Sequence, residues 1–157
     1  MQQIWAPWRM EYIETEKSEG CILCKKPGQD SDDVNHGLYR GGRNFVIMNK
    51  YPYNPGHLMI AAYRHIASLE ELTDEELHEH FDIVSRSITV LRRISSPAGF
   101  NLGINIGKVA GAGIEGHVHT HIVPRWEGDT NFMPVISDSK VVPEALAATY
   151  QKLKGGF

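Results

Sequence analysis

The chain of 157 residues lacks several features that would assign a function at once. It has only 2 cysteines, too few for a framework of disulfides. No apolar run approaches the roughly 20 residues that cross a bilayer, and residues 1–5 lack a basic-then-apolar secretion signal. The balance of 16 basic against 19 acidic residues gives a net charge of −3, which argues against a protein that coats nucleic acid. The sequence therefore predicts a cytoplasmic globular protein with no membrane or nucleic-acid partner.

Histidine, in contrast, is abundant, with 8 residues, and three of them alternate. His117, His119 and His121 lie in a run rich in β-branched residues. Side chains of a strand alternate between faces, so these three imidazoles are expected to share one face. Such a row can bind a metal, or it can present one imidazole as a nucleophile that its neighbours tune. The third alternative is a solvated strand face.

Both cysteines lie close together, at Cys21 and Cys24. The residues on either side read as loop, whereas a thioredoxin-like dithiol should follow a strand and open a helix. The spacing leaves two interpretations, a redox dithiol and half of a zinc site, and the loop context favours zinc. Zinc would need two further ligands, for which histidine is the only plentiful donor.

Hydrophobic patterning predicts an alternation of short strands with one strong helix. The helix begins at a capping box, Thr73 to Glu76, and ends before Pro97. Its apolar stripe would comprise Leu77, Phe81, Val84, Ile88 and Leu91, which leaves His78 and His80 on the solvated side. Strands are expected at 45–48, 57–62, 101–106 and 117–123.

The remaining segments are less regular. Residues 1–40 are expected to be mostly irregular, with Trp5, Pro7, Trp8 and Tyr12 as aromatic anchors. A glycine-rich loop at 107–116 would let backbone amides approach a phosphate, or would simply connect two strands. A last helix is expected from near Pro143 to Gly155, burying Leu146, Tyr150 and Leu153.

The run from His117 to Val123 matches the His-φ-His-φ-His-φ-φ signature of the histidine-triad family, with Thr120 as the one imperfect φ position. Asn49 and the pair Gly56-His57 also match that family's ribose-contacting residue and fourth histidine. Residues 5–10 and 124–132 resemble one branch in particular, the bacterial diadenosine-tetraphosphate phosphorylases. The resemblance extends over nearly the whole chain.

This resemblance implies an α+β fold, an antiparallel sheet of about five strands with one long helix and a C-terminal helix. It also implies a homodimer joined through a continuous sheet. The chain would be a single domain, 1–157, with an N-terminal arm at 1–40, a core at 41–126 and a tail at 127–157. The tail would cover the substrate.

The resemblance further implies attack on the α-phosphate of a dinucleoside polyphosphate. His119 would be the nucleophile, and His121, His57 and His117 would assist it. Asn49 would bind the ribose. Phosphate contacts would come from Asn105 and from the amides of Gly111, Ala112 and Gly113.

One departure from the family concerns residues 112–115. Many members carry a glutamine followed by serine or threonine there, and this chain reads Ala-Gly-Ile-Glu. The loss of that side-chain donor argues against efficient phosphoramidate hydrolysis and agrees with the phosphorylase branch.

The resemblance also completes the zinc site, because members with two N-terminal cysteines use two histidines at the positions of His65 and His117. Cys21, Cys24, His65 and His117 would then form a closed, structural tetrahedron. No organic cofactor is expected.

Several alternatives stay open from the sequence. The acceptor can be phosphate, which makes the chain a phosphorylase, or water, which makes it a hydrolase or phosphoramidase. A metal-dependent hydrolase and a non-catalytic nucleotide sensor are the two other classes. Lys50, Lys108 and Arg125 are possible anion contacts or plain surface charges.

Overall fold

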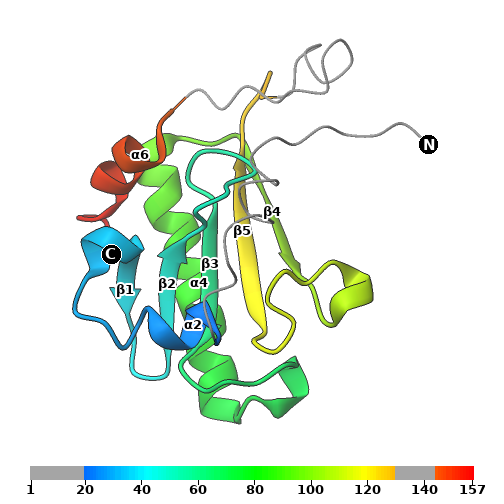
Figure 1. Cartoon of the computed structure of the whole chain (residues 1–157). Coiled ribbons are helices and arrows are strands. Elements are labelled where there is room, and N and C mark those ends of the chain that lie inside the picture. Colours follow the sequence, from blue (N-terminus) through cyan, green and yellow to red (C-terminus); the bar gives the residue numbers. More distant parts are fainter. Residues whose placement is uncertain (1–19, 130–143) are drawn as a thin grey trace.

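A computed structural model describes residues 20–129 and 144–157 of the chain (Figure 1). The fold is α+β, a five-stranded sheet in the order β1-β2-β3-β5-β4 in which each neighbouring pair is antiparallel. The strands are β1 (Gly37–Arg40), β2 (Asn44–Met48), β3 (Leu58–Ala62), β4 (Gly99–Ile104) and β5 (His119–Arg125). The helices are α2 (Ile22–Lys25), α3 (Asp32–Asn35), α4 (Asp74–Ser95) and α6 (Leu146–Leu153), with 3₁₀ turns at Leu69–Glu71 and Lys108–Ala110.

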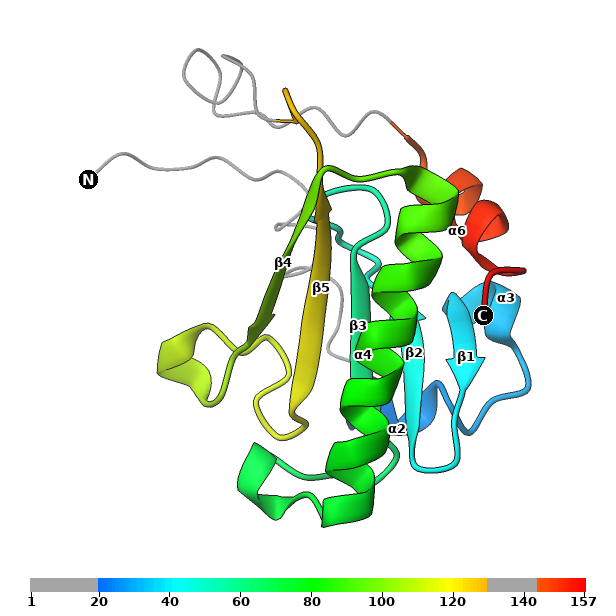
Figure 2. The same cartoon turned by 180° about the vertical axis from the view of Figure 1, so that it is seen from behind.

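The long helix α4 lies across one face of the sheet, as Figure 2 shows from behind. The core beneath it joins buried side chains of the sheet, such as Ile60 and Ile122, to Val84 and Leu91 of the helix. A smaller apolar cluster forms on the opposite face, where Leu23 packs on β2 and β3. No helix in the described part of the chain combines the length and the apolar character needed to span a bilayer.

Strand β5 divides its side chains between these two faces. Ile122 belongs to the core under α4, and Thr120 bonds to His80 of that helix. His119 and His121 alternate with them and therefore point to the opposite face. Across the sheet, Ala61 pairs with His119 and Met59 pairs with His121. These histidines therefore share a face with the small cluster around Leu23.

The helix boundaries predicted for 73–96 are confirmed. Thr73 is the N-cap, its hydroxyl accepts from the Glu76 amide, and the Glu76 carboxylate accepts from the Thr73 amide. The chain leaves the helix at Ser96 in a left-handed conformation, directly before Pro97.

The predicted buried stripe of α4 is partly wrong. Val84 and Leu91 are buried, but Leu77 and Phe81 are 38% and 50% exposed. His80, which was expected on the solvated side, is 2% exposed. Its Nδ1–H donates to Asn44 Oδ1 (3.0 Å), and its Nε2 accepts from the Thr120 hydroxyl (2.7 Å). Two hydrogen bonds satisfy the imidazole, so it can be buried where an apolar residue was expected.

The segment up to residue 40 is also more regular than expected, since it contains α2, α3 and strand β1. The C-terminal helix is confirmed at Leu146–Leu153, with Tyr150 and Leu153 buried and Leu146 packed beside the core. Three other features lie outside the described residues: the anchors Trp5, Pro7, Trp8 and Tyr12, the stretch 5–10, and residues 130–143 of the tail, which include Pro143.

Candidate active site and metal centre

Three imidazoles meet on the face of the sheet opposite α4, along β3 and β5. His57 directly precedes β3, and its Nε2 lies 2.9 Å from Nδ1 of His121. The ring centroids of His119 and His121 are 4.7 Å apart, and those of His57 and His121 are 5.0 Å apart. The structure therefore brings together three of the four predicted catalytic histidines.

Backbone groups determine which ring nitrogens carry protons. The Tyr53 amide donates to Nδ1 of His57 (3.2 Å), so a neutral His57 has its proton on Nε2 and donates it to His121. His121 accepts at Nδ1 and therefore presents an Nε2–H. Nδ1 of His119 donates to the carbonyl of His117 (2.9 Å), which leaves the Nε2 lone pair of His119 unprotonated.

Burial keeps all three rings neutral near pH 7. It is the main cause that lowers the pKa of His57 from 6.5 to about 3, and the neighbouring His121 and His119 lower it further. The pKa of His121 falls to about 4, again mainly by burial and then by His119. Burial also lowers the pKa of His119, although the bond to the His117 carbonyl opposes that shift. A neutral imidazole with a free lone pair beside a neutral N–H donor is suited to nucleophilic attack assisted by a hydrogen bond.

A second cluster, Cys21, Cys24, His65 and His117, could hold a metal ion. The four ligand atoms lie within 4.8 Å of one another. The Cys21 and Cys24 sulfurs are 3.3 and 3.4 Å from Nδ1 of His117, and the Cys24 sulfur is 3.3 Å from Nδ1 of His65. In a tetrahedral zinc site, bonds of about 2.3 Å to sulfur and 2.0–2.1 Å to nitrogen separate the two atoms by about 3.6 Å. The predicted ligand set therefore fits a zinc ion.

The surroundings of this cluster support the same conclusion. Nε2 of His117 donates to the Ala62 carbonyl (2.9 Å), which leaves Nδ1 free to act as a ligand. A Cβ at Gly116 would lie 3.2 Å from the His65 ring, so the glycine gives that ring room. Cys24 lies in the short helix α2 and Cys21 caps it, and the residues that follow the helix, 26–28, form turns.

The His117 ring belongs to this cluster. The residue precedes the first residue of β5, and its ring contacts His65 at right angles with centroids 5.2 Å apart. His57 joins His119 and His121 on this face, and His117 meets Cys21, which packs on the apolar cluster of the same face. His117 contributes to the catalytic group through its carbonyl, which holds His119.

The predicted substrate contacts are arranged around these rings. Asn49 Nδ2 is 3.4 Å from Nδ1 of His57, and Asn105 directly follows β4, whose last residue pairs with Thr120. In the glycine-rich loop, the amides of Gly111 and Ala112 donate to carbonyls of Lys108 and Gly107. Those two amides can contact a phosphate only after the loop gives up these bonds.

Arg125 is not an open anion contact. Its guanidinium forms a bidentate ion pair with Asp129 (2.6 and 2.8 Å) and also donates to Asn101 (2.8 Å). The arginine therefore fastens β5 to β4 and to the residues that follow β5. Lys50 and Lys108 remain exposed.

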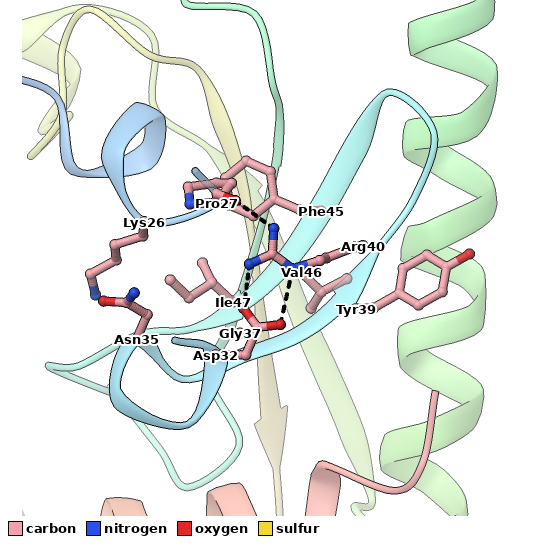
Figure 3. Close-up of a pocket in the computed structure, with 10 residues that line it drawn as sticks. All are labelled: Lys26, Pro27, Asp32, Asn35, Gly37, Tyr39, Arg40, Phe45, Val46 and Ile47. Atoms are coloured by element: carbon pink, nitrogen blue, oxygen red, sulfur yellow. Dashed lines mark hydrogen bonds and ion pairs between the residues drawn. The ribbon is translucent and has the colours of Figure 1, made fainter. Parts of the chain in front are cut away.

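A pocket on the β1 side of the sheet lies apart from the histidines (Figure 3). Arg40 crosses it, paired with Asp32 and bonded to the carbonyls of Pro27 and Gln29. Phe45 and Ile47 contribute apolar surface. The three imidazoles and the metal-cluster residues do not line this pocket. The contacts of Arg40 instead hold residues 27–32 against β1.

Sequence reasoning missed two residues that shape the site. Tyr53 stacks on the His57 ring, with centroids 4.9 Å apart and planes inclined by 24°. Asn54 is buried and donates to the Pro124 carbonyl and to Asp129 (both 2.8 Å). A loop was predictable here from its turn residues, Pro52, Asn54, Pro55 and Gly56. Those residues do not indicate which side chains of the loop face the histidines.

Comparisons with known proteins agree with this geometry. The family model described as HIT domain matches residues 34–128. A protein of Mycobacterium tuberculosis named AP-4-A phosphorylase is 39% identical over 161 residues, which cover 98% of this chain and 83% of that protein. The asymmetrical bis(5'-nucleosyl)-tetraphosphatase of Schizosaccharomyces pombe is 34% identical over 92 residues, covering 59% of this chain and 50% of that protein.

Solved structures share the fold. A zinc-bound histidine triad family protein from Mycobacterium smegmatis superimposes with a TM-score of 0.69 at 22% identity, covering 87% of this chain and 92% of that one. The triad strand, the fourth histidine and the match to the domain model all lead to one conclusion. The chain belongs to the histidine-triad (HIT) family.

Proposed function

We propose that the chain is a nucleotidyl transferase that cleaves dinucleoside polyphosphates such as diadenosine tetraphosphate, with inorganic phosphate as acceptor. The single observation that carries the proposal is the unprotonated Nε2 of His119 beside the N–H of His121. The identity to the protein named AP-4-A phosphorylase, over almost the whole chain, supports this substrate class.

In the first step, Nε2 of His119 attacks the α-phosphorus and forms a P–N bond. The bond from phosphorus to the bridging oxygen breaks, and ATP leaves. The Nε2–H of His121 donates a hydrogen bond to that oxygen and stabilises the negative charge that develops on it. The His117 carbonyl stabilises the charge that develops on His119, because it accepts the Nδ1 proton throughout.

In the second step, an oxygen of inorganic phosphate attacks the nucleotidyl-histidine and displaces His119. The proton of the attacking phosphate passes to solvent, the Nε2 lone pair of His119 is restored, and ADP leaves. Water in place of phosphate would give AMP, so the alternative function is a hydrolase that uses the same intermediate. Asn49 would bind the ribose hydroxyls and Asn105 a phosphate oxygen.

A metal-dependent hydrolase is less well supported. Within residues 20–129 and 144–157, the group with metal-ligand geometry is Cys21, Cys24, His65 and His117. That set fills all four positions of a tetrahedron and leaves none for water. The proposal therefore assigns zinc there a structural role, and reduced thiols fit a cytoplasmic location.

The proposal includes a homodimer joined at β4. This strand lies at the edge of the sheet, so its outer backbone groups face no other strand in the described chain. On the side of α4, Leu102 is 47% exposed and Phe81 is 50% exposed. Pairing of two β4 edges would cover both; a monomer mass by light scattering at micromolar concentration would contradict the dimer.

The test of the function is an analysis of products from diadenosine tetraphosphate with and without inorganic phosphate. ADP and ATP that form only with phosphate would establish the phosphorylase. AMP and ATP in both reactions would establish the hydrolase. No cleavage in either reaction would reject this substrate class and direct the assay to phosphoramidates and adenylated amines.

A further inference from the structure

Tyr53 presents an aromatic ring at the edge of the catalytic histidines. The side chain is 58% exposed, although one face of the ring stacks on His57. The same ring lies 6.3 Å from the centroid of His121, inclined by 43°. One face of the Tyr53 ring is therefore covered by an imidazole, and the other face is toward solvent.

The backbone around Tyr53 is held at both ends. Its amide donates to Nδ1 of His57, and the His57 amide in turn donates to the Asn54 carbonyl (3.1 Å). The buried Asn54 side chain bonds to the end of β5. Gly56 turns with a φ of +76°, and a Cβ there would lie 3.2 Å from Leu91 and 3.4 Å from Pro124. A ring fixed in this way loses little conformational entropy when a ligand packs on it.

The position of the ring relates it to one half of the substrate. The Nε2–H of His121 donates to the bridging oxygen of the leaving group, so the leaving nucleotide extends from His121. Tyr53 contacts His121 and His57, the two rings on that side. A base on the open face of Tyr53 would lie roughly 4.5–7 Å further out. The three phosphates and ribose of a leaving ATP are long and flexible enough to reach it.

We propose that Tyr53 is a stacking surface for the base of the leaving nucleotide and selects substrates that carry a second nucleoside. The inference rests on the proposed function, because it takes the direction of the leaving group from that chemistry. Every nucleobase has a flat π-face, so the contact selects for the presence of a base more than for its identity.

The inference is tested by binding, with the full-length His119→Ala protein, which lacks the nucleophile. Calorimetry compares diadenosine tetraphosphate with adenosine 5'-tetraphosphate, which lacks the second nucleoside. Stacking on one base corresponds to about a tenfold gain in affinity. We expect the ratio of the two dissociation constants to fall about tenfold in Tyr53→Ala and to persist in Tyr53→Phe, which keeps the ring.

Three results would overturn the inference. One is a ratio that survives Tyr53→Ala, another is an equal loss of affinity for both ligands, and the third is failure of diadenosine tetraphosphate to bind. An equal loss would mean that the ring only supports His57. Tyr53→Leu, which covers His57 without an aromatic face, replaces Tyr53→Ala if that variant does not fold. Since binding is measured without turnover, product analysis of the native enzyme judges the proposed function separately.

Discussion

His119 and His121 differ in chemistry because different neighbours hold their Nδ1 atoms. The His117 carbonyl accepts a hydrogen bond from Nδ1–H of His119, and the Nε2–H of His57 donates to Nδ1 of His121. The alternation of histidines could be recognised from the sequence, since it depends only on the period of a strand. The tautomers could not, because they depend on His57 and on a carbonyl that only the folded chain brings into contact.

Replacement of His119 by alanine should abolish turnover, by at least about 10³-fold, while nucleotide binding is retained. The reason is that no other imidazole has a free nitrogen at that point. Steady-state assays and calorimetry measure the two quantities. His78→Ala is the matched control, since His78 is exposed and, within the described residues, pairs with Asp82. Turnover that persists in His119→Ala would reject the nucleophile.

Replacement of His121 by alanine tests its role as a hydrogen-bond donor. We expect the rate with diadenosine tetraphosphate to fall about 10²–10⁴-fold. The loss should be much smaller with the p-nitrophenyl ester of AMP, because the negative charge on its leaving group needs little stabilisation by a hydrogen bond. Equal losses with the two substrates would show that His121 acts in some other way.

At the scale of elements, His80 joins α4 to β5 through Thr120 and to β2 through Asn44. The capping box and the end of α4 were predictable, because caps are local signals. The burial of His80 was not, since a stripe that counts only apolar residues assigns a histidine to solvent. Leu77 and Phe81 are the opposite case, since the pattern predicted burial and both are exposed. The apolar pattern does not distinguish the core of one chain from a surface that the proposed dimer would cover.

The buried, hydrogen-bonded His80 predicts that the protein loses stability in acid. Burial lowers the pKa of His80 from 6.5 to about 4, so between these values the unfolded chain binds the extra proton. The stability that His80 contributes is complete above pH 6.5 and is lost as the pH falls toward 4. At pH 5 the loss is about 2 kcal/mol.

Urea denaturation of the native protein and of His80→Gln, between pH 7 and pH 5, measures this contribution. The glutamine can keep both hydrogen bonds but does not titrate, so the variant should lose about 2 kcal/mol less over this range. His57 and His121 add to the acid loss in both proteins, which makes the difference between them the informative quantity. If the free energy of unfolding changed equally with pH in the two proteins, His80 would not bind a proton on unfolding.

At the scale of the whole molecule, the cysteine-histidine cluster joins three distant parts of the chain. Cys21 and Cys24 belong to the segment before the sheet, His65 follows β3, and His117 precedes β5. The two cysteines were evident as half a site. Their partners came from the family resemblance, because a separation of 93 residues in the chain gives no local signal.

We expect about one zinc ion per chain by elemental analysis, since four ligands close one tetrahedron. Removal of the metal should lower the melting temperature by about 5–10 °C, because the N-terminal segment loses its attachment to the sheet. Cys24→Ser should lower both the zinc content and the melting temperature. A metal-free protein that melts at the native temperature would contradict a structural role.

Strand β5 faces the catalytic space with its odd-numbered histidines and the core with Thr120 and Ile122. The sequence of this strand therefore cannot tolerate a shift of one position. An inserted or deleted residue would turn His119 toward α4 and present Thr120 to the substrate, so that the core and the reaction would fail together. Two inserted residues would restore the alternation. They would still change the spacing between the His117 carbonyl, which bonds to His119, and the Thr120 hydroxyl, which bonds to His80. Among homologues, we expect gaps in the glycine-rich loop before this strand and none between His117 and Ile122.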